Sequence, residues 1–351
     1  MTSADAIVFG ALAMQPGGGG VSTYAREMLR HLAPRLPAST TARAVVQHRS
    51  AADVPRGIAA DTVADSHGIG RAVRAKLPVA RGALFHSLDA DLPAWGPAAT
   101  VSTVHDLSVF DTPWAFSRIR ARGERALVSD AVRRADVVIA VSDFTAQRIA
   151  DRFGRDSIVT PLAPASWACP PKDSAVESVR ARYHLPDRFV LQVATVEPRK
   201  RPHLVAEAAR QLGVPCVLAG QGSDGPHAPR DAIGLGFVPT EDLPALYAAA
   251  TVVAYASVYE GFGLPPLEAM ACGAVVVASA VGALPEVVGD GAVLVGSPRL
   301  REWVAALRPL LLDADARVAV QDNAVRAATT LSWSATAAET LRAYDKAGVT
   351  L

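Results

Sequence analysis

The sequence predicts an α/β protein built from two facing, doubly wound domains of similar size. A chain of 351 residues exceeds one ordinary hydrophobic core and fits two domains. Short apolar runs alternate with helical patterns through both halves, which is typical of parallel sheets covered by helices on both faces. The alternation is interrupted near residues 161–171, a stretch rich in proline. We therefore expect a first domain over residues 1–165, a second over 166–332 and a terminal helical segment over 333–351.

Composition excludes several classes of protein. Half of the residues are hydrophobic and 20% are charged, and the net charge of +1 gives no reason to expect nucleic acid as a partner. Cys169, Cys216 and Cys272 lack the spacing of a zinc site or a disulfide framework. No basic signal-peptide region and no apolar run of about 18 residues is found. We expect a bacterial, cytoplasmic protein that is soluble or at most peripheral at the inner face of the membrane.

The first half opens with a strand at residues 7–10, a loop at 15–20 that ends in four glycines, and a helix at 21–32. This order makes a Rossmann-like βα unit. Further strands are expected at residues 44–46, 83–85, 101–104 and 137–141, with helices at about 117–134 and 143–153. In the second half, strands are expected at 189–193, 214–218, 233–237, 252–255, 275–277 and 293–295, each followed by a helix. A last helix is expected at 335–346.

The most informative segment is residues 260–273, which carries two carboxylates eight positions apart. Glu260 is expected in a glycine-rich turn after the strand at 252–255, and Glu268 in the first turn of a helix that begins near two prolines. The backbone amides of Phe262, Gly263 and Leu264 would then point outward at a helix N-terminus, which suits a phosphate. Each carboxylate beside a phosphate needs a hydroxyl-rich partner, which a sugar and a ribose would supply. Taken singly, Glu260 is better explained as a solvated loop charge and Glu268 as an acid favoured by the helix dipole.

Two further groups of residues follow the carboxyl ends of expected strands, where open α/β sheets bind ligands. Arg199 and Lys200 come after the strand at 189–193 and are candidates to clamp a diphosphate, although two solvated basic residues are the alternative. His105 comes after the strand at 101–104, and Asp106 is a candidate to orient its imidazole. A purely structural histidine is the alternative reading there.

Together these motifs resemble the retaining glycosyltransferases of family 4, which have the GT-B fold, and in style they are similar to bacterial mannosyltransferase-like members. The resemblance rests on Glu-Gly-Phe-Gly-Leu-Pro-Pro-Leu-Glu at 260–268, Glu-Pro-Arg-Lys at 197–200 and the glycine loop. Ala194 and Arg201 depart from the glycine and asparagine that are common in the family, and these departures concern only the local turn and the helix cap.

The resemblance implies a role for each candidate. Glu260 and His105 would contact the transferred sugar, Glu268 the ribose, and Arg199 with Lys200 the diphosphate. The donor phosphates would be approached by two sets of backbone groups, namely Gly19 and Gly20 from the first domain and Phe262, Gly263 and Leu264 from the second. The terminal helix would return to the first domain.

The implied reaction moves a hexose from a nucleotide sugar, with GDP-mannose favoured, to an acceptor hydroxyl of a glycan, glycolipid or natural product. No cofactor and no metal are expected, because the nucleotide sugar is a substrate and the two cations would replace a divalent ion. The Asp-Ala-Asp sequences at 89–91 and 313–315 resemble a metal motif of another glycosyltransferase fold and are set aside.

Two other functions stay open at this point. An inactive subunit that binds sugar nucleotides would need no turnover, and a nucleotide-sugar 2-epimerase of the same fold would need acid and base residues that no motif here supplies. Residues 70–81 are basic and amphipathic, so they suit either a solvated helix face or contact with an anionic membrane. The acceptor and the oligomeric state are not encoded in any motif.

Overall fold

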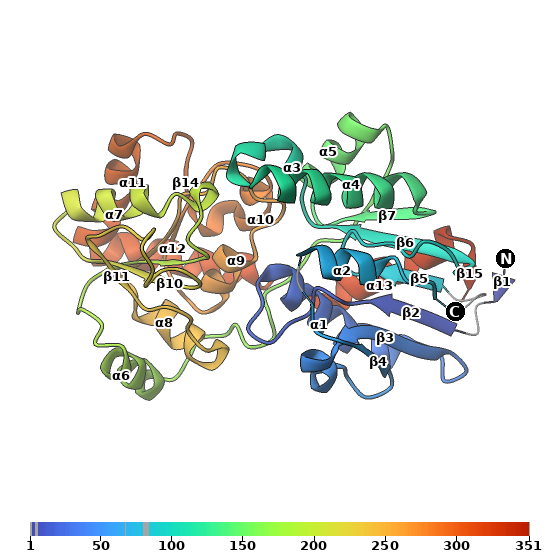
Figure 1. Ribbon diagram of the computed structural model, residues 1–351. Coiled ribbons are helices and arrows are strands. Elements are labelled where there is room, and N and C mark those ends of the chain that lie inside the picture. The colour runs from blue at the N-terminus through green and yellow to red at the C-terminus, as the bar shows by residue number, and fades with distance from the viewer. Residues whose placement is uncertain (1, 4–5, 67, 80–83, 351) are drawn as a thin grey trace. The chain divides into compact units, whose positions relative to one another are not determined.

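The computed structural model describes residues 2–3, 6–66, 68–79 and 84–350. The chain divides into two compact units, the first comprising Met1–Leu162 with Ser332–Leu351 and the second Ala163–Leu331 (Figure 1). Each unit is built around one parallel sheet. The linker expected near residues 161–171 coincides with the boundary between the units.

The sheet of the first unit has seven strands in the order β4-β3-β2-β5-β6-β7-β8, all paired in parallel. Their bounds are Ala6–Gly10 (β2), Thr41–Gln47 (β3), Ala59–Val63 (β4), Leu84–Ser87 (β5), Ala99–Val104 (β6), Val137–Ala140 (β7) and Ile158–Val159 (β8). The chain order reverses between β2 and β5, so loops from both strands diverge there. Strands β4 and β8 were not expected, because both lie at sheet edges and lack a buried apolar run.

Helices α1 (Gly20–Leu32), α2 (Gly68–Ala75), α3 (Ser108–Asp111), α4 (Arg118–Arg134) and α5 (Asp143–Phe153) belong to this unit. Serine side chains define two of their starts. Ser117 Oγ accepts a hydrogen bond from Arg120 N, and Ser142 Oγ accepts one from Thr145 N. Helix α5 ends at Gly154, which adopts the left-handed conformation.

The terminal helix α13 (Trp333–Lys346) packs within the first unit, where it contacts α1 and β7. Figure 1 shows this red helix among the blue and cyan elements of the N-terminal part. Thr336 Oγ1 donates to Pro161 O at 2.6 Å, and the end strands β1 (Thr2–Ser3) and β15 (Val349–Thr350) pair in parallel. The helix begins two residues earlier than expected because Ser332 Oγ caps it by accepting from Ala335 N.

The sheet of the second unit has six parallel strands in the order β11-β10-β9-β12-β13-β14. Their bounds are Val190–Val193 (β9), Cys216–Ala219 (β10), Ala232–Gly234 (β11), Val252–Tyr255 (β12), Val276–Ser279 (β13) and Val293–Val295 (β14). The helices are α6 (Asp173–Arg182), α7 (Pro202–Gln211), α8 (Leu243–Ala249), α9 (Leu264–Ala271), α10 (Leu284–Val288), α11 (Leu300–Leu312) and α12 (Ala314–Ala328). The chain order reverses between the neighbouring strands β9 and β12, so this is the switch point at which such sheets bind ligands.

One expectation about this unit is wrong. A helix was expected after every strand, but residues 220–231, which connect β10 to β11, form turns without a helix. Three glycines in this connection, Gly220, Gly222 and Gly225, favour turns over a helix. The interior is apolar and includes Val190, Val252 and the fully buried Trp303.

Candidate functional site

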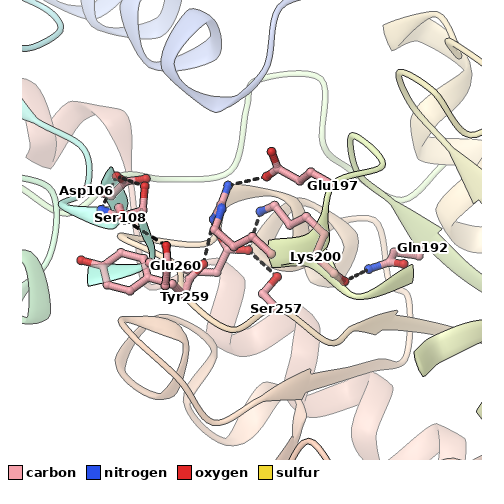
Figure 2. Close-up of polar contacts among 10 residues, drawn as sticks. Asp106, Ser108, Gln192, Glu197, Lys200, Ser257, Tyr259 and Glu260 are labelled. Atoms are coloured by element: carbon pink, nitrogen blue, oxygen red, sulfur yellow. Dashed lines mark hydrogen bonds and ion pairs between the residues drawn. The ribbon is translucent and has the colours of Figure 1, made fainter. Parts of the chain in front are cut away.

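The candidate site of the second unit lies at the switch point, where two loops leave neighbouring strands. The first loop follows β9 and contains the 3-10 turn η4 (Pro198–Lys200), which carries Arg199 and Lys200. The second follows β12 and carries Glu260. Figure 2 shows the labelled side chains of Lys200 and Glu260 pointing toward one another. The structure therefore brings three of the predicted site residues together.

Glu260 is the centre of this cluster. Its Oε1 accepts hydrogen bonds from Lys200 Nζ at 2.5 Å and from Ser257 Oγ at 2.6 Å, and its Oε2 lies 3.5 Å from Arg199 Nη1. The glutamate is 9% exposed. Burial by itself would raise the pKa of Glu260, but the charges of Lys200 and Arg199 and the hydrogen bonds from Lys200 and Ser257 outweigh it and hold the pKa below its ordinary value. The carboxylate is therefore ionised beside two cations.

The Arg199 side chain is fixed from several sides. Its Nη1 donates to Tyr259 O at 2.8 Å, and its Nη2 donates to Glu197 Oε1 at 2.8 Å. Its own carbonyl accepts from Val258 N at 2.9 Å, so main chain and side chain both join the two loops. A guanidinium held in this way is pre-organised, because little side-chain freedom remains to be lost on binding an anion.

The backbone of Lys200 is held as well. Gln192, which is buried within β9, donates from Nε2 to Lys200 O at 2.8 Å (Figure 2). Arg201 next to it has a φ of 46°, a left-handed conformation in which the asparagine common in the family is accommodated more readily than arginine. Gln192, Ser257 and Glu197 were not predicted as site residues. Each contacts a predicted site residue two to eight positions along the chain, but no motif marks it as the partner of that residue.

Helix α9 begins immediately after this cluster. Gly263 is its N-cap and has a φ of +110°, and a Cβ at this position would lie 2.5 Å from Leu284 Cδ2. Pro265 and Pro266 lack amide hydrogens, so Leu264 supplies the first free N–H of the helix. Phe262 is 6% exposed and packs inward. The predicted role of the Phe262, Gly263 and Leu264 amides as phosphate donors remains a prediction.

Glu268 requires a correction. It is the fifth residue of α9, in the second turn, and no acidic residue lies in the first turn. The helix starts at Leu264 because Gly263 adopts a positive φ there. The helix dipole therefore does not explain this acid. Glu268 is 7% exposed, which also distinguishes it from a solvated surface charge.

The first unit carries the remaining predicted residues. His105 follows β6 directly, and its Nε2 lies 2.9 Å from Leu88 O. Asp106 was expected to orient the imidazole, but it does not. Its Oδ1 accepts hydrogen bonds from both Ser108 N and Ser108 Oγ, at 2.9 and 2.7 Å. The peptide geometry of adjacent residues directs the carboxylate to the start of α3 instead.

Gly19 and Gly20 begin helix α1. Gly19 is the N-cap and Gly20 the first helical residue, and both are exposed. Ser22 holds the preceding loop, because its Oγ accepts from Gln15 N and donates to Gln15 O, both at 2.8 Å. The predicted phosphate contacts of Gly19 and Gly20 remain predictions.

The two Asp-Ala-Asp sequences have structural explanations. Asp89 and Asp91 surround Arg71, at 3.0 and 3.7 Å, and burial together with the charge of Asp89 raises the pKa of Asp91 to about 6. Asp313 caps α12 by accepting from Asp315 N at 2.9 Å. Over the described ranges, no group of three His, Cys, Asp or Glu side chains is arranged to hold a metal ion.

The basic segment 70–81 is described as far as residue 79, and Ala80 and Arg81 lie outside the described residues. Arg71 pairs with Asp89, and Lys76 pairs with Asp130 of α4. Val73 and Leu77 are exposed at 61% and 52%. Two of its basic side chains thus have partners within the unit, which favours a structural helix face. No helix in the described part of the chain is long and apolar enough to cross a membrane.

Known proteins match both units. The family model described as Glycosyltransferase Family 4 matches residues 42–161, and the model described as Glycosyl transferases group 1 matches residues 177–327. The O-antigen chain mannosyltransferase B of Escherichia coli is 34% identical over 265 residues, which cover 70% of this chain and 69% of that protein. The D-inositol 3-phosphate glycosyltransferase of Actinosynnema mirum is 32% identical over 285 residues, which cover 73% of this chain and 67% of that protein.

Solved structures share the fold. Sucrose-phosphate synthase from Thermosynechococcus elongatus matches with a TM-score of 0.75 and 21% identity, covering 97% of this chain and 98% of that one. The Anabaena protein HepE, solved in complex with UDP-glucose, matches with a TM-score of 0.73 and 20% identity, covering 96% of this chain and 99% of that one. The predicted fold class, two Rossmann-like doubly wound domains, is confirmed.

Proposed function

The chain belongs to the family 4 glycosyltransferases of the GT-B fold, and from this premise we propose that it transfers a hexose from a nucleoside-diphosphate sugar to an acceptor hydroxyl with retention of configuration. The observation that carries the proposal is the contact of Glu260 with Lys200 and Arg199 at the switch point between β9 and β12. A carboxylate suited to sugar hydroxyls lies there beside two cations suited to phosphates.

The proposed step needs only these groups. The bond between the anomeric carbon and the diphosphate oxygen breaks, the acceptor oxygen bonds to that carbon on the same face, and a donor phosphate oxygen takes the acceptor proton. Negative charge grows on the leaving diphosphate, where Lys200, Arg199 and the amides of Gly263 and Leu264 would stabilise it. Glu260 would orient the sugar, and Glu268 the ribose. His105, Gly19 and Gly20 remain predicted donor contacts from the first unit.

The donor favoured by this proposal is GDP-mannose. Its support is the motif style together with the mannosyltransferase relative of Escherichia coli. The solved complex of HepE with UDP-glucose supports a nucleotide sugar in general, but it also makes a uridine donor the main competitor. We further propose that no divalent metal is required, because Arg199 and Lys200 would supply the positive charge that a metal otherwise brings to the diphosphate.

Thermal unfolding tests the donor class. The purified protein is heated with GDP, UDP, dTDP or ADP, in EDTA and again with Mg²⁺. A nucleotide at a hundred times its dissociation constant adds about 2.7 kcal/mol to the stability of the folded state. We expect GDP to give the largest shift and EDTA to leave it unchanged. A larger shift with UDP would indicate a UDP-sugar donor in place of GDP-mannose. A shift seen only with Mg²⁺ would overturn metal independence.

Turnover separates the transferase from the two alternatives. Release of GDP from GDP-mannose with formation of a glycosylated product excludes an inactive partner subunit. Retention is read from the anomeric configuration of the product by NMR. Nucleotide binding without turnover on any acceptor would favour the inactive subunit instead, and interconversion of 2-epimeric nucleotide sugars would identify an epimerase.

A further inference from the structure

A chain of four buried polar side chains crosses the first unit from the terminal helix to α1. Tyr344 OH on α13 lies 2.7 Å from His86 Nδ1, and His86 Nε2 lies 3.0 Å from Thr103 Oγ1. Thr103 Oγ1 in turn lies 2.9 Å from Tyr24 OH. None of the four residues is more than 1% exposed. This buried chain of hydrogen bonds therefore connects α13, β5, β6 and α1 through side chains that solvent does not reach.

The hydrogen bonds of this chain have a direction. Burial, followed by the charge of His105, lowers the pKa of His86 to about 3, so its imidazole is neutral near pH 7. A neutral imidazole donates from one nitrogen and accepts at the other. His86 therefore donates one of its hydrogen bonds to Tyr344 and Thr103 and accepts the other. Each hydroxyl in the chain is oriented by its neighbour.

The chain ends on a ring that touches His105. The rings of Tyr24 and His105 are arranged edge to face, with centroids 4.7 Å apart and an interplanar angle of 77°. On another side, the Trp333 ring of α13 lies 6.1 Å from the Tyr24 ring, centroid to centroid. Tyr24 is therefore held by α13 directly and through the polar chain.

His105 has a second fixed contact. Its Nε2 lies 2.9 Å from Leu88 O, and since a carbonyl oxygen only accepts, Nε2 carries a proton. In the neutral ring Nδ1 is then the nitrogen that accepts a hydrogen bond, as a sugar hydroxyl would require. The Leu88 bond fixes the tautomer, and the Tyr24 ring fixes the plane of the imidazole.

We propose that Tyr24 is a positioning residue for His105, and that Tyr344 of the terminal helix acts on the same histidine through His86, Thr103 and Tyr24. This rests on the proposed function, because the orientation of His105 matters only if it contacts the donor. Stability alone gives little reason for the chain, since burying polar groups in pairs yields a small net gain that apolar side chains could match. Orientation of the terminal ring is what an apolar replacement would lose.

Substitutions of Tyr24 test the proposal with two readouts. Tyr24→Leu removes the ring and Tyr24→Phe removes only the hydroxyl. We expect Tyr24→Leu to lower kcat about 10- to 100-fold, as small misplacements of a reacting group do, with little change in donor KM. Tyr24→Phe and Tyr344→Phe should give smaller losses. His105 is assigned in the ¹⁵N spectrum by its disappearance in His105→Ala. In Tyr24→Leu the imidazole can rotate out of its plane and away from Leu88 O, so the signal should change from the single Nε2–H tautomer to a mixture.

Tyr247→Phe is the matched control, because Tyr247 is a buried tyrosine of the second unit whose hydroxyl accepts from Tyr255 OH at 3.3 Å. It should lower Tm without changing the His105 signal. An unchanged His105 signal and unchanged kcat in Tyr24→Leu would overturn the proposal. If Tyr24→Leu fails to fold, Tyr344→Phe tests the proposal instead. An unchanged His105 signal in Tyr344→Phe would then overturn the proposal.

His105→Ala separates this inference from the proposed function. Full turnover in His105→Ala would show that the histidine has no part in the reaction. The positioning role of Tyr24 would then be overturned as well. Loss of turnover in His105→Ala, together with wild-type turnover in Tyr24→Leu, would leave the function standing and remove only the positioning role.

Discussion

Lys200 Nζ lies 2.5 Å from Glu260 Oε1, and the two side chains are only 14% and 11% exposed. The pair connects loops that are 60 residues apart in sequence and that follow the adjacent strands β9 and β12. Removing one partner of such a pair leaves a buried charge unbalanced, which costs more than the pair contributes. The position of each loop thus depends on the other.

Glu260→Gln should separate catalysis from nucleotide binding. The amide keeps the shape of the side chain but removes the charge that would orient the sugar, while Lys200 and Arg199 remain to bind phosphate. We expect kcat to fall about 100- to 1,000-fold, the usual effect of losing one aligned electrostatic contact. The Kd for the nucleotide should not rise, because Lys200 and Arg199 lose a neutralising neighbour, whereas Tm should fall because their buried charges are left unbalanced. Steady-state kinetics and calorimetry measure kcat and Kd.

The control is Glu207→Gln, which removes an exposed glutamate paired with Arg210 on α7. Such a surface pair contributes little, so turnover and Tm should stay near wild type. Wild-type turnover in Glu260→Gln would remove the glutamate from the proposed mechanism.

Ser257→Ala should change the pH dependence of turnover. Ser257 is fully buried and donates to Glu260 Oε1 at 2.6 Å, and this bond helps to hold the pKa of Glu260 below its ordinary value. Without it the pKa rises, so the carboxylate becomes protonated at a higher pH. We expect the acidic limb of the kcat profile to move to higher pH in Ser257→Ala and to return in Ser257→Thr. An acidic limb that is identical in all three proteins would contradict this role.

The fold was predictable because its signals are local. Val252–Tyr255 and Val276–Ser279 are buried throughout and apolar except for Ser279, as strands buried on both faces are, and each precedes a loop and a helix. Edge strands lack this signal. Ala59–Val63 exposes or half-exposes every residue, so it has no apolar pattern to recognise.

The site was predictable only in part, for a related reason. Glu260, Arg199 and Lys200 follow strands directly, and the rule for open parallel sheets places them at one edge. The side chains that hold them, such as Gln192 and Ser257, act across a loop or a turn, and no motif in the sequence marks those contacts. Asp106 shows the opposite failure, because a neighbour in sequence was taken as a partner although its carboxylate bonds Ser108.

His86 should make the protein less stable as the pH falls. Its folded pKa of about 3 is below its ordinary value of 6.5, so between these values the unfolded chain binds more protons and acid favours unfolding. Lowering the pH from 7 to 5 should cost about 2 kcal/mol from this residue alone, at about 1.4 kcal/mol per pH unit below 6.5. Urea unfolding at both pH values measures the change.

The comparison with His86→Gln isolates this contribution, since other groups titrate in the same range. Asp91, whose folded pKa is raised to about 6, acts with the opposite sign, because acid stabilises a carboxyl that is protonated more readily in the folded state. The variant starts less stable at pH 7 because its polar chain is broken, but it should lose less on acidification than wild type. An equal loss in both proteins would show that His86 titrates normally.

Gly263→Ala should weaken nucleotide binding through the backbone. At a φ of +110° the alanine is strained, and its Cβ would meet Leu284 Cδ2 at 2.5 Å, where Leu284 is fully buried and cannot move away cheaply. The start of α9 must shift, and with it the amides of Gly263 and Leu264 that are proposed to face the diphosphate. Gly273→Ala tests strain without that clash, because Gly273 follows the other end of α9 with a φ of +80° and the nearest heavy atom 3.9 Å from its added Cβ. Both variants should lower Tm, but only Gly263→Ala should raise the Kd for the nucleotide, measured by calorimetry at a temperature where both are folded. Equal Kd values in the two variants would mean that the start of α9 does not bind the donor, and that its glycine serves only the turn.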